Sequence, residues 1–485
     1  MRRTLVGPSS TARPAPAAAP RPVVQKGGLA VSWRATVGSV ACVAQSSACL
    51  AVATDDGAVV FVDNAGDITA RSPQIADEGP NAMDFSPRPS MLVACYDDGY
   101  ARVLQSTTRI TSVGRNGAPV RGEAPLRSLG TSADFAMVVE HQVAPPPVAG
   151  KRARTIPATH CAAIADPNVH SSSDVCAIAC SAGKLVHCVD VPSGELRHAH
   201  TFDAPVRALC RDPLLEEGTQ VTGYYVAYGT TIARVTCTND GPAEGEGQIT
   251  KRYTSTRPLR SLAPREDGWL TAGTFDGAIQ VWGNQDTYEP FELSLQSFCR
   301  SDGEALAWSS DGGFLATTGA RAACFDFTGQ RPHHPYRRPQ YDDEEDVQYE
   351  PDAIPRVCGF AETRERCVAW APGGAILATV DAVGVVRLWN LRGRLKKGGQ
   401  GHPQQPQLMK PQFFLFPQLD AAHPSGDAAK PAFVGWLSAD TVVVVYERGD
   451  IVAFRVAPPP AVAAAPPPPL IFTEALKAAG AKNVM

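Results

Sequence analysis

Short apolar runs separated by glycine turns repeat along much of this chain. Residues 50–62 form an apolar run, an Asp-Asp-Gly turn and a second run, and residues 92–104 repeat the same order. The Asp-Gly step favours a tight hairpin, because such a turn needs a positive φ that glycine adopts without steric cost. Each segment is therefore predicted to be a β-hairpin.

The hairpin pattern recurs with a period. Its turn glycines fall at positions 57, 99, 183, 229, 277, 319, 384 and 449. Most neighbours are 42–48 residues apart, and the gap between 99 and 183 is twice 42, which predicts a further copy near His141. The last two gaps are longer and contain insertions at residues 331–355 and 394–430.

A further alternating run precedes most hairpins, as at residues 82–87, 206–210, 305–309, 367–372 and 433–436. A period of about 40–45 residues with four short strands per unit is typical of the blades of a β-propeller. Residues 29–34 precede the first full unit, and the last unit ends at Val456. We expect residues 29–34 to supply the outer strand of the last blade, which closes the ring and leaves no open sheet edge.

On these residues the chain resembles the WD-repeat (WD40-like) β-propeller family over residues 29–456. The best matching segments are 368–390, which ends in Arg387-Leu388-Trp389-Asn390, and 305–327. The repeats are degenerate: the opening Gly-His dipeptide is absent from the strands, and the Trp-Asp ending is replaced by Trp282-Gly283 or Phe325-Asp326. The hydrogen-bond networks that depend on that His and Asp are therefore not carried over.

The predicted fold class is all-β: a single closed WD40-like propeller of seven to nine blades, with loop insertions and flexible termini. The repeat count favours nine blades, although single propellers usually have four to eight. Residues 1–28 are predicted to be a flexible basic tail rich in Pro and Ala, residues 457–469 a Pro-rich linker, and residues 470–485 a short helix or docking tail.

The composition argues against a strongly basic, a disulfide-rich or a membrane-spanning protein. Hydrophobic residues make up 44% of the chain, charged residues 19%, and the net charge is −4, so no global basic field attracts nucleic acid. The 13 cysteines form no Cys-x-x-Cys pair and mostly lie in apolar runs, which favours buried thiols in a reducing compartment. No apolar stretch is long enough to span a bilayer.

The acid-free N-terminus leaves two interpretations of localisation. No acidic residue precedes Asp55, which is compatible with a mitochondrial leader. Prolines at positions 8, 14, 16, 20 and 22 disfavour the amphipathic helix of such leaders, so a cytoplasmic protein with a basic tail is the preferred prediction.

Four segments are candidates for partner contact. The insertion at 331–355 changes from basic to acidic, and it either docks on a basic partner or is an inert solvated loop; its candidate residues are Tyr341, Asp342, Asp343, Glu344, Glu345, Asp346 and Tyr349. The apolar residues of the tail either fold back on the propeller or bind a partner; these are Leu470, Ile471, Phe472 and Leu476. Two basic clusters either contact RNA or anionic lipid or are solvated; they comprise Lys151, Arg152, Arg154, Arg392, Arg394, Lys396 and Lys397.

No catalytic, cofactor or metal motif is visible, so the sequence predicts a non-enzymatic scaffold without a cofactor. We expect it to bind other protein subunits within a eukaryotic multi-subunit complex, in the cytoplasm or in cytoskeletal, ciliary or nuclear-pore association; a homo-oligomer is not indicated. One alternative is an RNA- or ribosome-associated propeller that uses the basic tail and loops. Another is a propeller enzyme or small-molecule binder that uses the central channel, where Asp84, Arg207 and Arg260 are the charged candidates.

Overall fold

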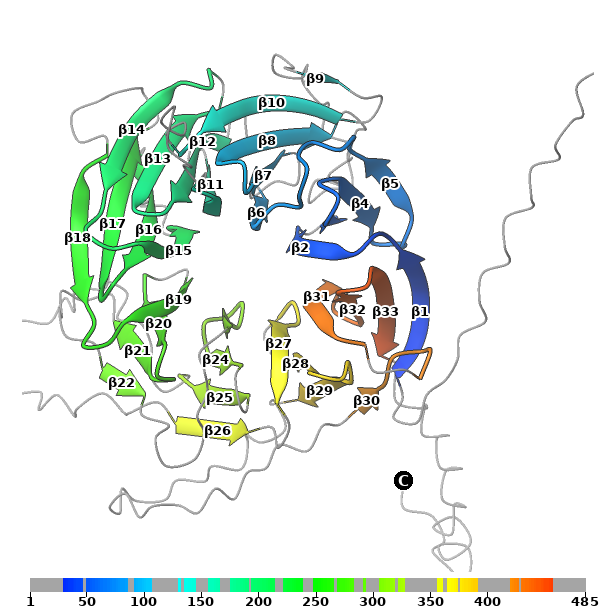
Figure 1. Cartoon of the computed structure of the whole chain (residues 1–485). Helices are drawn as coiled ribbons and strands as arrows, with labels where there is room; N and C mark the ends of the chain where they lie inside the picture. Colours follow the sequence, from blue (N-terminus) through cyan, green and yellow to red (C-terminus); the bar gives the residue numbers. More distant parts are fainter. Residues whose placement is uncertain are drawn as a thin grey trace, which may run out of the picture.

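The computed structural model describes a ring of β-sheets between residues 29 and 456. The described ranges are 29–46, 49–85, 91–106, 130–131, 135–144, 156–165, 175–191, 193–213, 221–238, 247–265, 268–282, 291–293, 305–318, 322–327, 356–360, 364–373, 376–390, 419–426 and 429–456. These residues form 33 strands and no helix, arranged as eight sheets around a central opening (Figure 1).

The first four blades follow the chain in order. Blade 1 contains β2 (Val40–Gln45), β3 (Cys49–Thr54), β4 (Val59–Asp63) and β5 (Ile68–Arg71). Blade 2 contains β6 (Ala82–Phe85), β7 (Met91–Cys95), β8 (Tyr100–Ser106), β10 (Phe135–Gln142) and β9 (Gly130–Thr131). Blade 3 contains β11 (Ala158–Ala165), β12 (Val175–Ala182), β13 (Leu185–Asp190) and β14 (Leu196–Thr201). Blade 4 contains β15 (Val206–Arg211), β16 (Val221–Tyr228), β17 (Thr231–Thr238) and β18 (Ile249–Thr254).

The remaining blades complete the ring. Blade 5 contains β19 (Leu259–Pro264), β20 (Leu270–Thr274), β21 (Ile279–Trp282) and β22 (Phe291–Leu293). Blade 6 contains β23 (Leu306–Trp308), β24 (Phe314–Thr317), β25 (Ala323–Asp326) and β26 (Arg356–Phe360). Blade 7 contains β27 (Glu365–Trp370), β28 (Ile376–Asp381), β29 (Val386–Asn390) and β30 (Leu419–Ala421). Blade 8 contains β31 (Pro431–Ser438), β32 (Thr441–Tyr446), β33 (Asp450–Val456) and β1 (Leu29–Thr36).

The ring closes through a strand from the opposite end of the chain. Strand β1 pairs antiparallel with β33, from Leu29 opposite Val456 to Thr36 opposite Asp450. The prediction that residues 29–34 close the last blade is therefore confirmed. Because this pairing joins the start of the described chain to its end, every blade contacts two neighbours and no blade is terminal (Figure 1).

The structure has eight blades, which lies within the predicted range but corrects the preferred count of nine. The expected extra unit near His141 is not a blade: residues 135–142 form β10, which pairs with β8 as an outer strand of blade 2. Alternation of apolar and polar residues identifies a strand but not its position within a blade. The doubled spacing thus reflects a long blade 2 and not a weak repeat.

The glycine turns adopt the predicted backbone. Within the described residues, the turn glycines have φ between +53° and +99°; they are Gly57, Gly99, Gly183, Gly229, Gly277, Gly384 and Gly449. Each lies between the second and third strands of its blade, so all seven lie at one end of the ring. We call this end the turn face.

Apolar packing between neighbouring blades forms the core. The described buried residues fall into eight hydrophobic clusters, and each cluster joins two adjacent blades. The cluster between blades 8 and 1, for example, includes Val443 and Val445 from β32 together with Val52 and Val60 from blade 1. Burial of this apolar surface is the main force that holds the blades together.

Indole groups on the innermost strands add a repeated contact between blades. Trp308 Nε1 donates to Ala263 O at 3.1 Å, Trp370 Nε1 to Ala307 O at 2.9 Å, and Trp436 Nε1 to Ala369 O at 3.1 Å. Each carbonyl belongs to the innermost strand of the preceding blade. These tryptophans therefore fix the spacing of blades 5 to 8 around the channel.

The structure describes only part of the two predicted insertions. The C-terminal end of the 394–430 segment contains β30, the outer strand of blade 7, so the segment includes part of that blade. Residues 331–355 lie outside the described residues, as do the predicted tail 1–28, the linker 457–469 and the segment 470–485. No helix in the described part of the chain is long and apolar enough to cross a membrane.

Candidate interaction surface

The partner-binding residues predicted from the sequence lie outside the part of the chain that the structure describes. This applies to the acidic insertion from Tyr341 to Tyr349, to the apolar tail residues from Leu470 to Leu476, and to both basic clusters. The structure therefore does not test these predictions. The described residues instead bring together other groups, on the turn face and in the channel.

An exposed aromatic residue marks one sector of the turn face. Phe275 occupies the turn between β20 and β21, and 52% of its surface is exposed. Its backbone N–H donates to Pro258 O, which holds the turn against the start of β19. Contact with a further apolar side chain would bury this ring favourably.

Two arginines from neighbouring blades flank Phe275. The guanidinium of Arg207, on β15 of blade 4, lies 5.5 Å from the ring centroid, and that of Arg260, on β19 of blade 5, lies 5.9 Å away. At these distances a guanidinium is attracted to the electron-rich ring face. We call Phe275, Arg207 and Arg260 the aromatic-cationic patch.

A third arginine stabilises the same turn. Arg257 forms an ion pair and hydrogen bond with Asp276, and Asp276 also accepts a 2.6 Å hydrogen bond from Thr274 Oγ1. Desolvation opposes ionisation of Asp276, but the Thr274 and Arg257 hydrogen bonds prevail and hold its pKa below the usual value. The charge of Arg257 is thus offset within the turn.

The turn face carries the opposite charge over blades 1 and 2. Glu78 lies next to Asp97, and the hydrogen bond between the two carboxyl groups raises the pKa of Glu78 above its ordinary value. Asp97 also accepts a 2.8 Å hydrogen bond from Asn81 Nδ2. Blade 1 lies across the ring from blade 5, and blade 3 separates blade 2 from blade 4, so the turn face presents two sectors of opposite charge (Figure 1).

A cavity lies at the other end of the channel. It has a volume of about 680 Å³, and its lining includes Asp84 from β6, Arg211 from β15, Arg265, and the turn that follows Trp308. Burial raises the pKa of Asp84, although Ala163 N donates a 2.9 Å hydrogen bond to its carboxylate. Of the three charged residues that the sequence suggested for the channel, only Asp84 lines this cavity; Arg207 and Arg260 belong to the turn face.

Arg265 is a fixed part of the cavity wall. It is only 5% exposed, its guanidinium lies 4.6 Å and 4.9 Å from the rings of Trp269 and Trp308, and its Nη1 donates to Gly312 O at 2.9 Å. Because aromatic rings and a carbonyl already contact this cation, its observed contacts are structural.

Other buried charges also stabilise single blades. Arg387 on β29 donates to Glu365 Oε1 at 2.9 Å and to Asp381 Oδ2 at 2.8 Å, while Trp389 Nε1 donates to Thr379 Oγ1 at 2.9 Å. This network lies in the segment that most resembles a WD repeat. It pairs Asp381 with Arg387.

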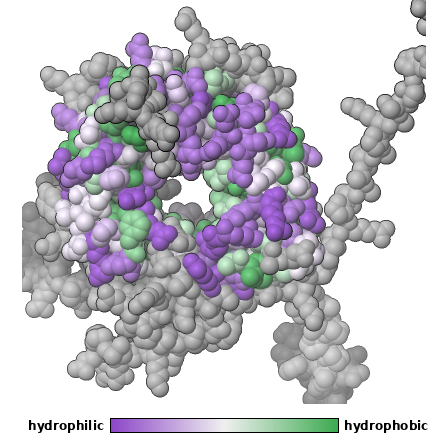
Figure 2. All heavy atoms as spheres, in the orientation of Figure 1, coloured by the Kyte–Doolittle hydropathy of each residue, from purple (hydrophilic) through white to green (hydrophobic). Residues whose placement is uncertain are grey.

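Figure 2 shows one face of the molecule, which is hollowed at the centre of the ring. Hydrophilic residues predominate around the opening, and hydrophobic residues form small, separate areas (Figure 2).

The sequence pattern suggested Arg207 and Arg260 only as channel residues and did not single out Phe275. Phe275 occurs within a recognised hairpin, and nothing in its local pattern distinguishes it from a buried strand residue. The available signal was its position one residue before an Asp-Gly turn, where a side chain projects from the end of a blade.

Comparison with known proteins supports the fold. No protein-family model and no curated protein sequence matches this chain. The structure is similar to the C-terminal WD40 domain of Sif2, with a TM-score of 0.54 and 11% sequence identity over 89% of this chain and 99% of that domain. It is also similar to the β-propeller domain of Cps50 (Swd1) from Myceliophteria thermophila, with a TM-score of 0.46 and 11% identity over 88% of this chain and 99% of that one. The likeness to the Sif2 domain and the eight-bladed topology establish a WD40-like propeller.

Proposed function

We propose that this protein is a non-catalytic scaffold that binds a protein partner through the aromatic-cationic patch on its turn face. The observation that carries the proposal is the exposed ring of Phe275 between Arg207 and Arg260. Aromatic residues and arginine are enriched among the residues that dominate binding energy at protein interfaces. WD40-like propellers generally mediate protein–protein interactions, which agrees with this assignment.

The chemistry of the patch selects the partner segment. Two arginines beside an exposed phenyl ring fit a segment that combines an apolar side chain with a carboxylate. The apolar group would cover Phe275, and the carboxylate would accept hydrogen bonds from a guanidinium. The acidic sector on blades 1 and 2 would repel the same segment, so docking has a preferred orientation.

The rest of the fold is compatible with a rigid platform for protein binding. The buried side chains of the described blades pack against neighbouring blades or form internal ion pairs. The ring therefore supplies a rigid frame for its surface turns. We extend the proposal to a eukaryotic, cytoplasmic multi-subunit complex, in which the acidic insertion at 331–355 and the segment 470–485 would add contacts. The RNA-associated alternative depends on basic residues outside the described part of the chain.

Isolation of the tagged protein from its own cells tests this function. We expect stoichiometric protein partners to co-elute with the wild-type protein and to be lost from a Phe275→Ala variant, since truncation of such an anchor costs about 2 kcal/mol or more. Leu196→Ala is the matched control, because Leu196 is 48% exposed but lies on β14 at the rim. This variant should retain the partners.

Two results would contradict the proposal. One is equal recovery of partners by the Phe275→Ala and wild-type proteins. The other is elution of the wild-type protein as a lone monomer of 51.3 kDa. The second result would instead favour a small-molecule site in the channel cavity, with Asp84 as its charged residue.

A further inference from the structure

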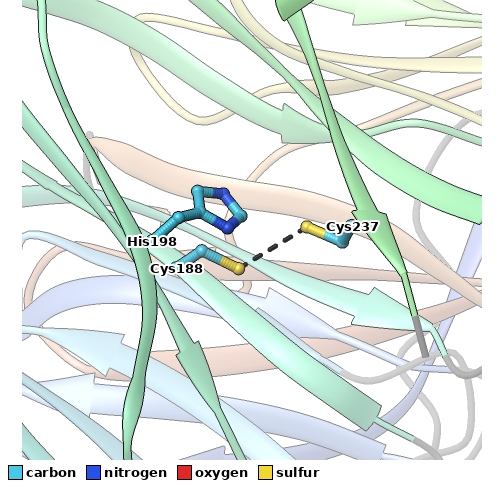
Figure 3. A group of neighbouring side chains, drawn as sticks. All are labelled: Cys188, His198 and Cys237. Carbon is cyan, nitrogen blue, oxygen red and sulfur yellow. Dashed lines mark hydrogen bonds between the residues drawn. The ribbon is translucent and has the colours of Figure 1, made fainter. Parts of the chain in front are cut away.

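Two cysteines and a histidine meet between blades 3 and 4. Cys188 lies on β13, His198 on β14 and Cys237 on β17 of the next blade, and one donor atom from each lies within 4.8 Å of the other two. Figure 3 shows the imidazole beside the two sulfur atoms, which face each other across the blade interface. We propose that these residues bind one Zn²⁺ ion that bridges blades 3 and 4.

The strand register positions two of the ligands. Cys188 and His198 are direct partners in the antiparallel pairing of β13 with β14. Side chains of directly opposed residues project from the same face of a sheet. Both therefore face blade 4, from which Cys237 approaches.

The distances suit a tetrahedral ion. The two sulfurs are 3.5 Å apart. Two thiolates on a tetrahedral Zn²⁺, with Zn–S bonds of about 2.3 Å, are separated by about 3.8 Å, so a small adjustment suffices.

The charge balance suits the buried setting. Both cysteines are fully buried. When the ion binds, each thiol loses its proton to solvent, and the two thiolates neutralise the charge of Zn²⁺. A neutral site avoids the large cost of placing an isolated charge in the interblade core.

A second group orients the histidine. Nε2 of His198 lies 3.1 Å from the hydroxyl oxygen of Tyr224, and the two rings stack with an interplanar angle of 3°. Histidines that bind metal ions usually hold the other ring nitrogen in a hydrogen bond, which fixes the tautomer. With Nε2 directed at Tyr224, Nδ1 is assigned to the ion.

The backbone at Gly247 also holds the imidazole. A Cβ built on Gly247 would lie 2.7 Å from Cγ of His198. The chain thus packs closely against the ring and limits its movement. Three protein ligands leave a fourth position, which a water molecule can fill because His198 is only partly buried.

Cobalt binding to the whole protein tests the site. Protein purified under reducing, oxygen-free conditions and stripped with a chelator is titrated with Co²⁺. We expect one equivalent per chain, a near-ultraviolet band from sulfur-to-cobalt charge transfer, visible bands typical of tetrahedral cobalt, and displacement by Zn²⁺. Zn²⁺ should also raise the midpoint of thermal unfolding in a concentration-dependent manner.

Variants assign the ligands. Cys188→Ala, Cys237→Ala and His198→Ala should each abolish the stoichiometric cobalt spectrum. Tyr224→Phe should keep the spectrum and weaken affinity roughly 10- to 100-fold, as expected for a group that orients a ligand. Cys367→Ala, at a partly buried cysteine on β27 of blade 7, is the control and should bind normally.

Three outcomes would overturn the proposal. The first is an absence of stoichiometric binding by the folded wild-type protein, which does not depend on any variant. The second is an unchanged cobalt spectrum in folded His198→Ala protein, which would place the ion at other cysteines. The third is isolation of the native protein with Cys188 and Cys237 joined as a disulfide, shown by mass spectrometry of peptides prepared without reductant.

Discussion

Single residues in the turns show why the repeat uses glycine. Gly57 has φ of +81°, and an added Cβ would lie 2.1 Å from the carbonyl oxygen of Ala76. Both the left-handed backbone and the close approach of the next connection therefore exclude a side chain. Gly426 has a similar φ of +78° but no heavy atom within 4 Å of the added Cβ, so only the backbone conformation favours glycine there.

Substitutions at these two positions distinguish the cost of a left-handed backbone from the cost of a steric clash. Gly426→Ala should lower the free energy of unfolding by about 1 kcal/mol, the usual cost of left-handed backbone for alanine. Gly57→Ala should lower it by roughly 3 kcal/mol, because the backbone near Ala76 must also move. Urea denaturation of both variants measures the difference, and equal losses would contradict the role assigned to the Ala76 contact.

At the level of elements, two histidines join β10 of blade 2 to β13 of blade 3. Nε2 of His141 on β10 lies 3.0 Å from Nδ1 of His187 on β13. Burial lowers the pKa of both imidazoles, and the proximity of His187 lowers that of His141 further. The folded protein therefore favours the neutral pair, which can share a hydrogen bond, over the pair with two charges.

This pair predicts a loss of stability in acid. Because the folded pKa values are depressed, the contribution to stability is fully present above the unfolded value of about 6.5 and is lost as the pH falls through the folded values. We expect His141→Gln to flatten the pH dependence of the free energy of unfolding below about pH 6.5. Denaturation of both proteins at several pH values measures this effect. The other histidines remain in both proteins. Parallel curves of the free energy of unfolding against pH would therefore show that the pair contributes nothing to the pH dependence.

Across the whole molecule, stability depends on closure by β1. Leu29 is fully buried in the cluster between blades 7 and 8, and β1 supplies the fourth strand of blade 8. Without this strand, β33 would expose a row of unpaired backbone groups, which promotes association between molecules. The ring would also lose apolar burial at one of its eight interfaces.

Two truncations test the importance of closure. Removal of residues 1–36 should lower the midpoint of thermal unfolding sharply and produce oligomers in sedimentation velocity, because the edge of β33 is exposed. Removal of residues 1–28 leaves β1 intact and should change neither property. A monomeric protein of unchanged stability after the longer deletion would show that β1 is dispensable.

The sequence by itself determined the hairpins, their glycine turns, the closing strand and the propeller class. The hairpins and turns depend on local preferences, namely alternation of apolar residues and the positive φ of Asp-Gly turns, which are visible within a dozen residues. The WD-like segment at 368–390 was recognisable for the same reason. The propeller class followed from the period of about 40–45 residues at which these hairpins recur. The local pattern did not specify the position of each strand within its blade, as residues 135–142 demonstrate.

The number of blades, the aromatic-cationic patch and the proposed zinc site became visible only in the tertiary structure. Phe275 meets Arg207, and Cys188 meets Cys237, only because neighbouring blades pack side by side with a particular rotation. These contacts join residues that are 68 and 49 positions apart, and no local pattern specifies them. The sequence repeat specifies each blade, whereas the side-chain contacts between blades depend on how the blades pack around the ring.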